Sequence, residues 1–172
     1  IRMVQGAVAR APNASTMDLL LFRLGWALTA QQRHHEALRV YRLLIQRFPT
    51  SVYLPHAFLV FAEHYFEQSE WSSAAEFYER VLLPATTDNR VHALALYRLA
   101  WMRLYQRDAA GALPRFEEVL AWATEHPDAP DIARLAAAAR VERDVALWAA
   151  QPDRRVRGAE APGDVDAMAR AA

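Results

Sequence analysis

The stretch LFRLGWALTAQQRHHEALRVYRLLIQRFP, residues 21–49, decides the fold because its pattern recurs twice further along the chain. It pairs a large and a small residue, Leu24-Gly25, and continues with a small residue at Ala37 and an aromatic at Tyr41. Two later segments keep the same offsets: Phe61-Ala62, Ala74 and Tyr78, then Leu99-Ala100, Ala112 and Phe116. Small residues let two helix backbones approach, and the aromatic fills the wedge between one helix pair and the next. The sequence therefore predicts three closely packed antiparallel helix pairs.

Hydrophobic periodicity and helix-breaking residues give the expected bounds of these helices. The pairs are 17–31 with 34–48, 53–68 with 71–83, and 89–106 with 109–125, and a seventh helix follows at 131–150. Pro49, Pro84 and Pro127 close the three pairs. We therefore expect an all-α, right-handed α-solenoid over 17–150 with a C-terminal capping helix. Its three helix-turn-helix repeats are about 18–51, 55–88 and 93–126.

Residue types at the helix ends add three local predictions. Ser15 or Thr16 is expected to cap the first helix, and Ser69 to cap the fourth. Pro114 lies inside the sixth expected helix, where proline costs about 3 kcal/mol unless it falls near the helix start. That helix is therefore expected to begin late or to bend at Pro114.

The seventh helix, 131–150, lacks the small/aromatic signature. Its apolar residues recur at three- or four-residue spacing: Leu135, Ala138, Val141, Val145 and Trp148. Such a stripe predicts a capping helix that covers the end of the repeat stack, packed near Phe116 and Leu120. Residues 1–16 are expected to be irregular, and 151–172 to form a flexible tail with little to bury.

Composition excludes several classes of partner. Apolar residues make up 53% of the chain, enough for a packed core, but no run of about 18 apolar residues could insert into a membrane. All 20 basic residues are Arg, and 20 acidic residues balance them to a net charge of zero. Nucleic acid is therefore not an expected partner, because it requires a concentrated positive surface. The absence of Cys excludes disulfides and thiolate metal sites, and suits either a cytosolic or a periplasmic location.

No residue pattern for catalysis or metal binding stands out. The sequence has no Cys nucleophile, no GxSxG, no P-loop and no dinucleotide-binding glycine pattern. His34-His35 lies at an expected turn, and His56 and His64 are too far apart along a helix to share one metal ion. We therefore expect no enzyme activity, no cofactor, no metal and no small-molecule substrate.

The three copies resemble the tetratricopeptide repeat, whose pattern runs from Trp and Leu-Gly through a small residue and an aromatic to a closing Pro. The first copy matches at Leu21, Leu24-Gly25, Leu28, Ala37, Tyr41, Leu44 and Pro49. The resemblance covers about residues 18–126. The copies are 37 and 38 residues apart, longer than the usual ~34, and Arg103 stands where Tyr or Leu is usual. A variant or Sel1-like helical repeat is therefore an open alternative.

A narrower resemblance concerns the cellular location. The link RFP-x-S-x-Y-x-x-x-A, from Arg47 to Ala57, is similar to that of envelope-associated tetratricopeptide proteins of Gram-negative bacteria. These include outer-membrane-assembly, Tol–Pal-associated and gliding-motility types. The resemblance implies a multiprotein envelope assembly in the periplasm or at the outer membrane; a cytoplasmic location is the alternative. The sequence begins at Ile1 and not at Met, so a fragment or a processed piece of a longer protein is an open alternative.

In tetratricopeptide proteins the first helix of each pair lines the concave surface, so the resemblance also implies a partner-binding groove. Carried over residue by residue, the groove comprises Phe22, Arg23, Trp26, His56, Glu63, Tyr97, Arg98, Trp101 and Tyr105. Aromatic residues and Arg are typical interface anchors, and Arg can hold the carboxylates of a peptide. Two alternatives stay open: Trp26 and Trp101 pack in the core, or Arg23 and Arg98 pair with Glu63.

The sequence thus favours a non-enzymatic scaffold or adaptor that binds a protein or peptide partner. One alternative is a self-assembling structural subunit that stacks through the solenoid ends or the seventh helix. Another is a regulatory domain of a larger protein.

Overall fold

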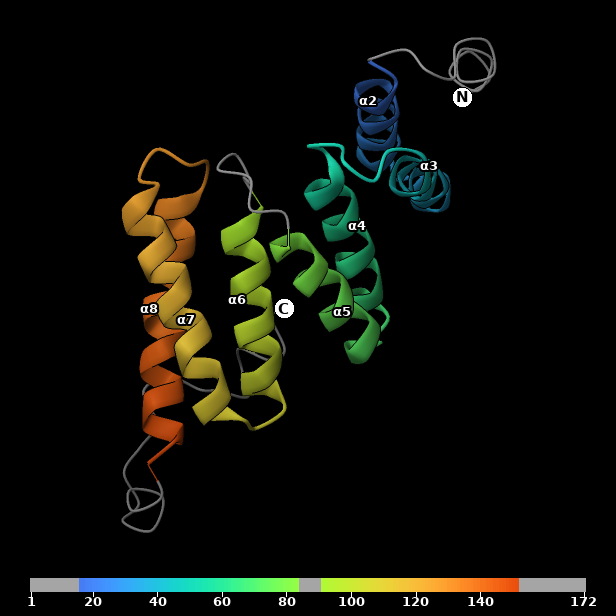
Figure 1. The fold of residues 1–172 in the computed structure, drawn as a ribbon. Coiled ribbons are helices and arrows are strands. Elements are labelled where there is room, and N and C mark those ends of the chain that lie inside the picture. The colour runs from blue at the N-terminus through green and yellow to red at the C-terminus, as the bar shows by residue number, and fades with distance from the viewer. Residues whose placement is uncertain (1–15, 84–90, 152–172) are drawn as a thin grey trace. The chain divides into compact units, whose positions relative to one another are not determined.

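The computed structural model describes residues 16–83 and 91–151, and every regular element within these ranges is an α-helix (Figure 1). The chain divides into two compact units, Ile1–Asn89 and Arg90–Ala172. The N-terminal unit contains α2 (Met17–Ala30), α3 (His34–Arg47), α4 (Leu54–Glu67) and α5 (Trp71–Leu82). The C-terminal unit contains α6 (His92–Tyr105), α7 (Ala109–Glu125) and α8 (Ile132–Ala149). The predicted all-α fold of helical hairpins is confirmed.

Each expected helix is present, with bounds close to those predicted. The largest difference is at α6, which begins at His92 rather than at residue 89. The expected irregular start, the cap at Ser15, the closure at Pro84 and the tail from residue 152 onward lie outside the described residues.

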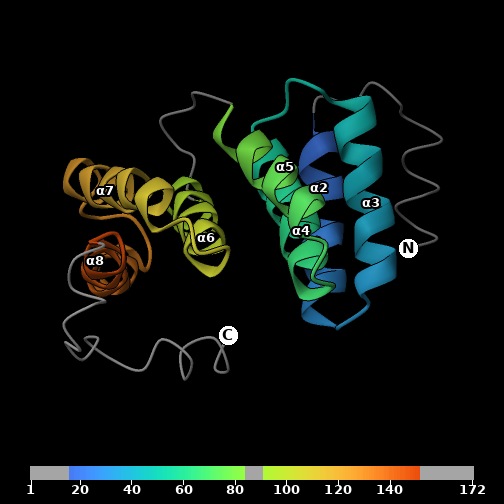
Figure 2. The same ribbon diagram turned by 90° about the horizontal axis from the view of Figure 1, so that it is seen from below.

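In the N-terminal unit, α2 and α3 form one hairpin and α4 and α5 a second (Figure 2). Helix α3 also contacts α4. The repeat aromatics are buried, with Tyr41 2% exposed and Tyr78 fully enclosed at 0%. Ala37 and Ala74, the small residues one turn earlier, are buried as well, at 1% and 0%. Close approach at the small residue and filling by the aromatic therefore occur as the repeat pattern predicts.

All three repeat hairpins turn in the same way. Gln32, Ser69 and Arg107 have positive φ angles of 59°, 60° and 64°. In each hairpin, the N–H of this residue and that of the next donate to carbonyl groups three and five residues back. This Schellman arrangement ends the first helix of each pair. The prediction that Ser69 caps α5 is therefore wrong: Ser69 belongs to the end of α4, and Glu70 occupies the cap position of α5.

In the C-terminal unit, α6 and α7 form a hairpin, and α8 packs along α7 and also contacts α6. The buried residues of α8 are Ile132, Ala136, Ala139, Glu142, Val145 and Ala146. The predicted stripe is wrong at Val141, which is 54% exposed. Alanines at three- or four-residue spacing form much of the buried face instead, because their small side chains let the helices approach closely.

The structure also tests the predictions about helix starts. Helix α7 begins at Ala109 in spite of Pro114, so the predicted late start is wrong, and the alternative of a bend at Pro114 stays a prediction. Asp108 stabilises this start, since its Oδ1 accepts a hydrogen bond from the Gly111 N–H at 2.9 Å. Thr16 does occupy the cap position of α2, but its hydroxyl makes no capping hydrogen bond.

Candidate partner-binding surfaces

The N-terminal unit brings Phe22 of α2 and His56 of α4 together through an aromatic contact. The ring centroids of Phe22 and His56 are 5.3 Å apart in an edge arrangement. Phe22 also stacks on Tyr53 at 4.7 Å with an interplanar angle of 10°. Tyr53 was not among the predicted site residues, although the expected helix 53–68 began with it; in the structure it directly precedes α4. The feature of the sequence that could have identified Tyr53 is an aromatic residue directly after the turn residues between the two hairpins.

A chain of hydrogen bonds positions Tyr53. Ser51 Oγ donates to Asp18 Oδ2 of α2 at 2.8 Å, and the Tyr53 N–H donates to Ser51 Oγ at 3.2 Å. The link between the two hairpins is thus tied to the first turn of α2. This fixes the aromatic cluster of Phe22, Tyr53 and His56 on the α2–α4 side of the unit.

Trp26 lies one turn beyond Phe22 on α2 and is 65% exposed. It is not part of the core of the N-terminal unit. Arg23 is also exposed, and it makes no ion pair with a described residue. The surface of α2 therefore presents an indole and a guanidinium to solvent near the aromatic cluster.

Glu63 on α4 has a structural contact within its own repeat. Its Oε1 accepts a 2.7 Å hydrogen bond from the hydroxyl of Tyr78, the buried repeat aromatic. This contact satisfies the polar end of Tyr78, whose side chain is fully enclosed. The predicted site residue Glu63 is thus partly buried and helps to hold α4 against α5.

In the C-terminal unit, α6 carries Tyr97, Arg98, Trp101 and Tyr105 of the predicted groove. Trp101 and Tyr105 are stacked, with centroids 5.5 Å apart and an interplanar angle of 13°, and Tyr105 is 53% exposed. Tyr97 lies deeper and contacts Phe116 edge-on at 6.0 Å. Burial raises the pKa of the Tyr97 hydroxyl, and Glu142 raises it further.

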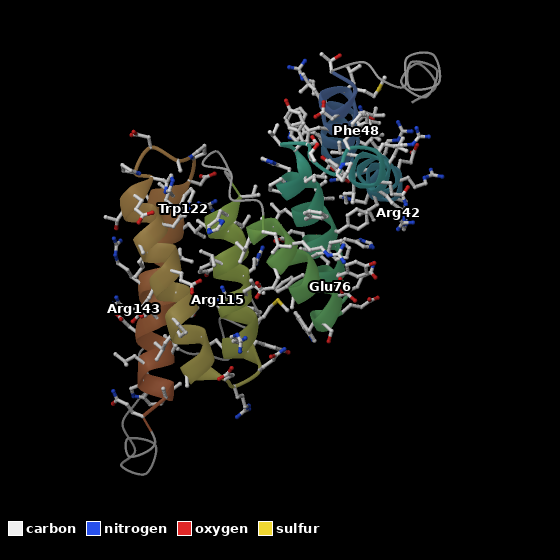
Figure 3. The ribbon with its side chains drawn as sticks, viewed as in Figure 1. Arg42, Phe48, Glu76, Arg115, Trp122 and Arg143 are labelled. Carbon is white, nitrogen blue, oxygen red and sulfur yellow. The ribbon has the colours of Figure 1, made fainter. Side chains whose placement is uncertain are left out.

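A cavity of about 450 Å³ lies between α6 and α8. Trp122 of α7, labelled in Figure 3, forms part of its wall. Tyr97 and Arg98, both predicted site residues, line it. The other lining residues are Val91, Ala93, Leu94, Trp122, Pro130, Asp131, Ile132, Arg134, Leu135 and Ala138. The contributions of α7 and α8 were not predicted. Leu135 and Ala138 belonged to the predicted apolar stripe, but Trp122 has no counterpart in the repeat pattern.

Two histidines stack with Trp122 beside this cavity. The His126 ring is 4.1 Å from the Trp122 ring and nearly parallel to it, and the His92 ring is 5.9 Å away at 20°. His126 Nδ1 also lies 3.0 Å from the Trp122 carbonyl oxygen. Burial lowers the pKa of His92; the charge of Glu118 opposes this effect and that of His126 adds to it. The stacked rings hold the indole in the cavity wall.

Glu142 is a buried carboxyl on α8, 7% exposed. Burial raises its pKa. No described side chain forms an ion pair with it, and its charge raises the pKa of the Tyr97 hydroxyl. An ionised Glu142 is therefore unfavourable in this packing.

The described residues contain no group of three or more His, Cys, Asp or Glu side chains arranged to hold a metal ion. Among the helices at 16–83 and 91–151, none is long and apolar enough to cross a membrane.

Comparison with known proteins identifies the repeat. Residues 20–51, which span most of α2, all of α3 and the first residues of the following link, match the tetratricopeptide repeat. No curated protein sequence matches the chain. The match agrees with the Leu24-Gly25, Ala37 and Tyr41 positions and with the hairpin that they form. Residues 20–51 therefore match a tetratricopeptide repeat, and this repeat is the part of the chain that the comparison identifies.

Proposed function

We propose that the chain is a non-enzymatic scaffold or adaptor that binds a partner protein or peptide through the aromatic and Arg residues of α2, α4 and α6. Tetratricopeptide repeats are generally protein–protein interaction modules, so the match at residues 20–51 supports this class of function. The choice of surface rests on the residues that each unit leaves in contact with solvent. The two units contribute separately to this proposal, through α2 and α4 in one and α6 in the other.

The observation that carries the proposal is the exposure of large aromatics on the first helices of the hairpins. Trp26 is 65% exposed and Tyr105 is 53% exposed. Trp and Tyr are enriched among residues that dominate binding energy at interfaces, and Arg residues lie close to both in the sequence. An exposed indole next to an exposed guanidinium, as at Trp26 and Arg23, suits a partner with apolar and acidic groups.

Partner capture with matched variants tests this proposal. The tagged chain and its Trp26→Ala variant are used to recover partners from the source cells, with Val52→Ala as control because Val52 is similarly exposed, at 64%. We expect at least one protein to be recovered by the wild type and Val52→Ala but lost with Trp26→Ala. Equal recovery by all three chains would contradict the proposed surface.

The envelope assembly is a further part of the proposal and rests on the resemblance of the link from Arg47 to Ala57. We propose a location in the periplasm or at the outer membrane, with the cytoplasm as the alternative. Fractionation of the source cells with an antibody to the chain tests it. Recovery with cytoplasmic markers alone would contradict the envelope location.

Self-association is a second candidate, favoured by apolar side chains that α8 leaves exposed. Val141 and Leu147 are 54% and 50% exposed. Multi-angle light scattering distinguishes this candidate, since Val141→Ser with Leu147→Ser is expected to dissociate an oligomer formed through α8. A monomeric wild-type chain at all concentrations would contradict it.

A further inference from the structure

The cavity between α6 and α8 has the size and lining of a site for one large side chain. Its volume is about 450 Å³, within the range of small-ligand pockets. Leu94 and Leu135 supply aliphatic surface, while Tyr97 and Trp122 supply two aromatic walls. A large aliphatic or aromatic group would therefore exchange water for apolar contacts on several sides.

The charged side chains around the cavity favour an anion. Arg98 and Arg134 line it together with one acidic residue, Asp131. The Arg134–Asp131 pair is long, at 3.8 Å, and the two side chains are 84% and 76% exposed, so it neutralises Arg134 only weakly.

A second aromatic surface lies further along the same helix, where Tyr105 is 53% exposed. Beyond Tyr97 and Arg98, α6 presents the stacked pair Trp101 and Tyr105. Arg98 and Tyr105 are about 10 Å apart along the helix axis, which about three residues of an extended chain would span. A peptide anchored in the cavity could therefore reach this pair with its neighbouring residues.

We propose that the cavity binds a large apolar or aromatic side chain of a partner segment that carries a carboxylate next to that side chain. The inference deepens the proposed function and rests on it: the partner is an acidic, apolar-anchored peptide segment. The apolar group occupies the space between Tyr97, Trp122 and Leu135. The carboxylate lies toward Arg134 at the rim, and the flanking residues run along α6 toward Trp101 and Tyr105.

Three probes that share a phenylbutyl group and differ in the charge of their polar end test the charge preference of the cavity. They are 4-phenylbutyrate, 4-phenylbutan-1-ol and 4-phenylbutan-1-amine. Binding to the full chain is followed by NMR at the indole N–H of Trp122, assigned from its loss in Trp122→Phe. We expect the carboxylate to bind about fivefold more tightly than the amine, the ratio given by about 1 kcal/mol. Equal or tighter binding of the amine would overturn the proposed anion preference.

Adjacent alanines on α8 provide a matched pair of variants. Ala138 lines the cavity, whereas Ala137 is exposed and does not. Ala138→Phe should abolish binding of 4-phenylbutyrate, and Ala137→Phe should leave it unchanged. Unaltered binding by Ala138→Phe would show that the probe binds elsewhere and would overturn the site.

A third variant does not depend on how the cavity tolerates a larger residue. The Arg134 side chain is 84% exposed, so Arg134→Gln should fold normally. It should reduce the preference for the carboxylate over the alcohol while leaving the affinity for the alcohol unchanged. An unchanged preference would contradict the role of Arg134.

The two proposals fail in different ways. If Trp26→Ala abolishes partner capture but 4-phenylbutyrate does not bind, the cavity inference is wrong and the proposed function stands. If the probe binds and Ala138→Phe blocks it, but partner capture is insensitive to Trp26, the cavity is a binding site and the proposed surface is wrong.

Discussion

The ring of Tyr41 lies directly on Gly25: a Cβ atom placed at residue 25 would be 2.6 Å from Cζ of Tyr41. The large/small pair of the repeat therefore brings α2 against α3 with no room for a methyl group. At the equivalent position of the second hairpin, Ala62 is accommodated and fully buried. The closeness of the first hairpin thus depends on Gly25 in particular.

Gly25→Ala should destabilise the N-terminal unit by about 1–3 kcal/mol. The clash with the enclosed ring outweighs the gain of about 1 kcal/mol that Ala brings to a helix interior. Urea unfolding followed by circular dichroism measures the effect. In a Tyr41→Val background, the loss of stability caused by Gly25→Ala should disappear. If Gly25→Ala is more stable than the wild type when Tyr41 is present, the packing of Tyr41 on Gly25 is contradicted.

Ser69→Gly should stabilise the N-terminal unit by up to about 1 kcal/mol, because Ser69 has φ 60° and glycine adopts this conformation without strain. Ser72→Gly is the matched control, since Ser72 lies inside α5 and the same substitution there should destabilise by about 1 kcal/mol. Thermal unfolding of both variants gives the comparison. Destabilisation of equal size at both positions would contradict the role of the turn.

Glu142→Gln should increase the stability of the C-terminal unit at neutral pH. Burial raises the pKa of Glu142 from its ordinary 4.5, so the folded state holds this proton more tightly than the unfolded state. The stability contributed by the protonated carboxyl is therefore present at low pH and is lost as the pH rises through the folded pKa. Urea unfolding between about pH 4 and pH 8 should show this loss in the wild type and in Glu117→Gln, but not in Glu142→Gln. A less stable Glu142→Gln at neutral pH would mean that the carboxylate is favourably paired.

His92 should give a pH dependence of the opposite sign. Burial lowers its pKa from 6.5, so the unfolded state takes up the proton more readily. The stability contributed by neutral His92 should therefore be lost as the pH falls from 6.5 through the folded pKa. In urea unfolding across this range, His92→Gln should remove part of the loss, whereas His34→Gln, at an exposed position of α3, should not. The same acid-dependent loss in all three chains would contradict the assignment to His92.

The hairpins could be predicted from sequence because the repeat residues Leu24-Gly25, Ala37 and Tyr41 act through local packing and recur at fixed offsets. Helix ends were less predictable. Ser69 has the residue type of a cap, but the Schellman turn of the preceding helix determines its conformation. Pro114 does not delay α7, because the cap at Asp108 starts the helix ahead of the proline, which then lies inside it.

The candidate surface was predictable in part. The position of each residue within the repeat pattern predicted Tyr97 and Arg98, which line the cavity. It also predicted Trp26 and Tyr105, which are exposed. The repeat pattern could not predict Trp122, because this residue has no equivalent position in the repeat. Trp122 reaches the cavity through the packing of α7 against α6 and α8. The burial of Glu142 likewise depends on which face α8 turns inward.

Site-specific photocrosslinking tests the central claim most directly, because it reports contact with a partner at single positions. A photoreactive phenylalanine is placed at Trp26, at Tyr105 and, as control, at Val52, positions that are 65%, 53% and 64% exposed. We predict crosslinks to the same partner protein from positions 26 and 105 and none from position 52. Crosslinks from position 52 alone, or from none of the three, would contradict binding through the aromatic and Arg residues of α2 and α6.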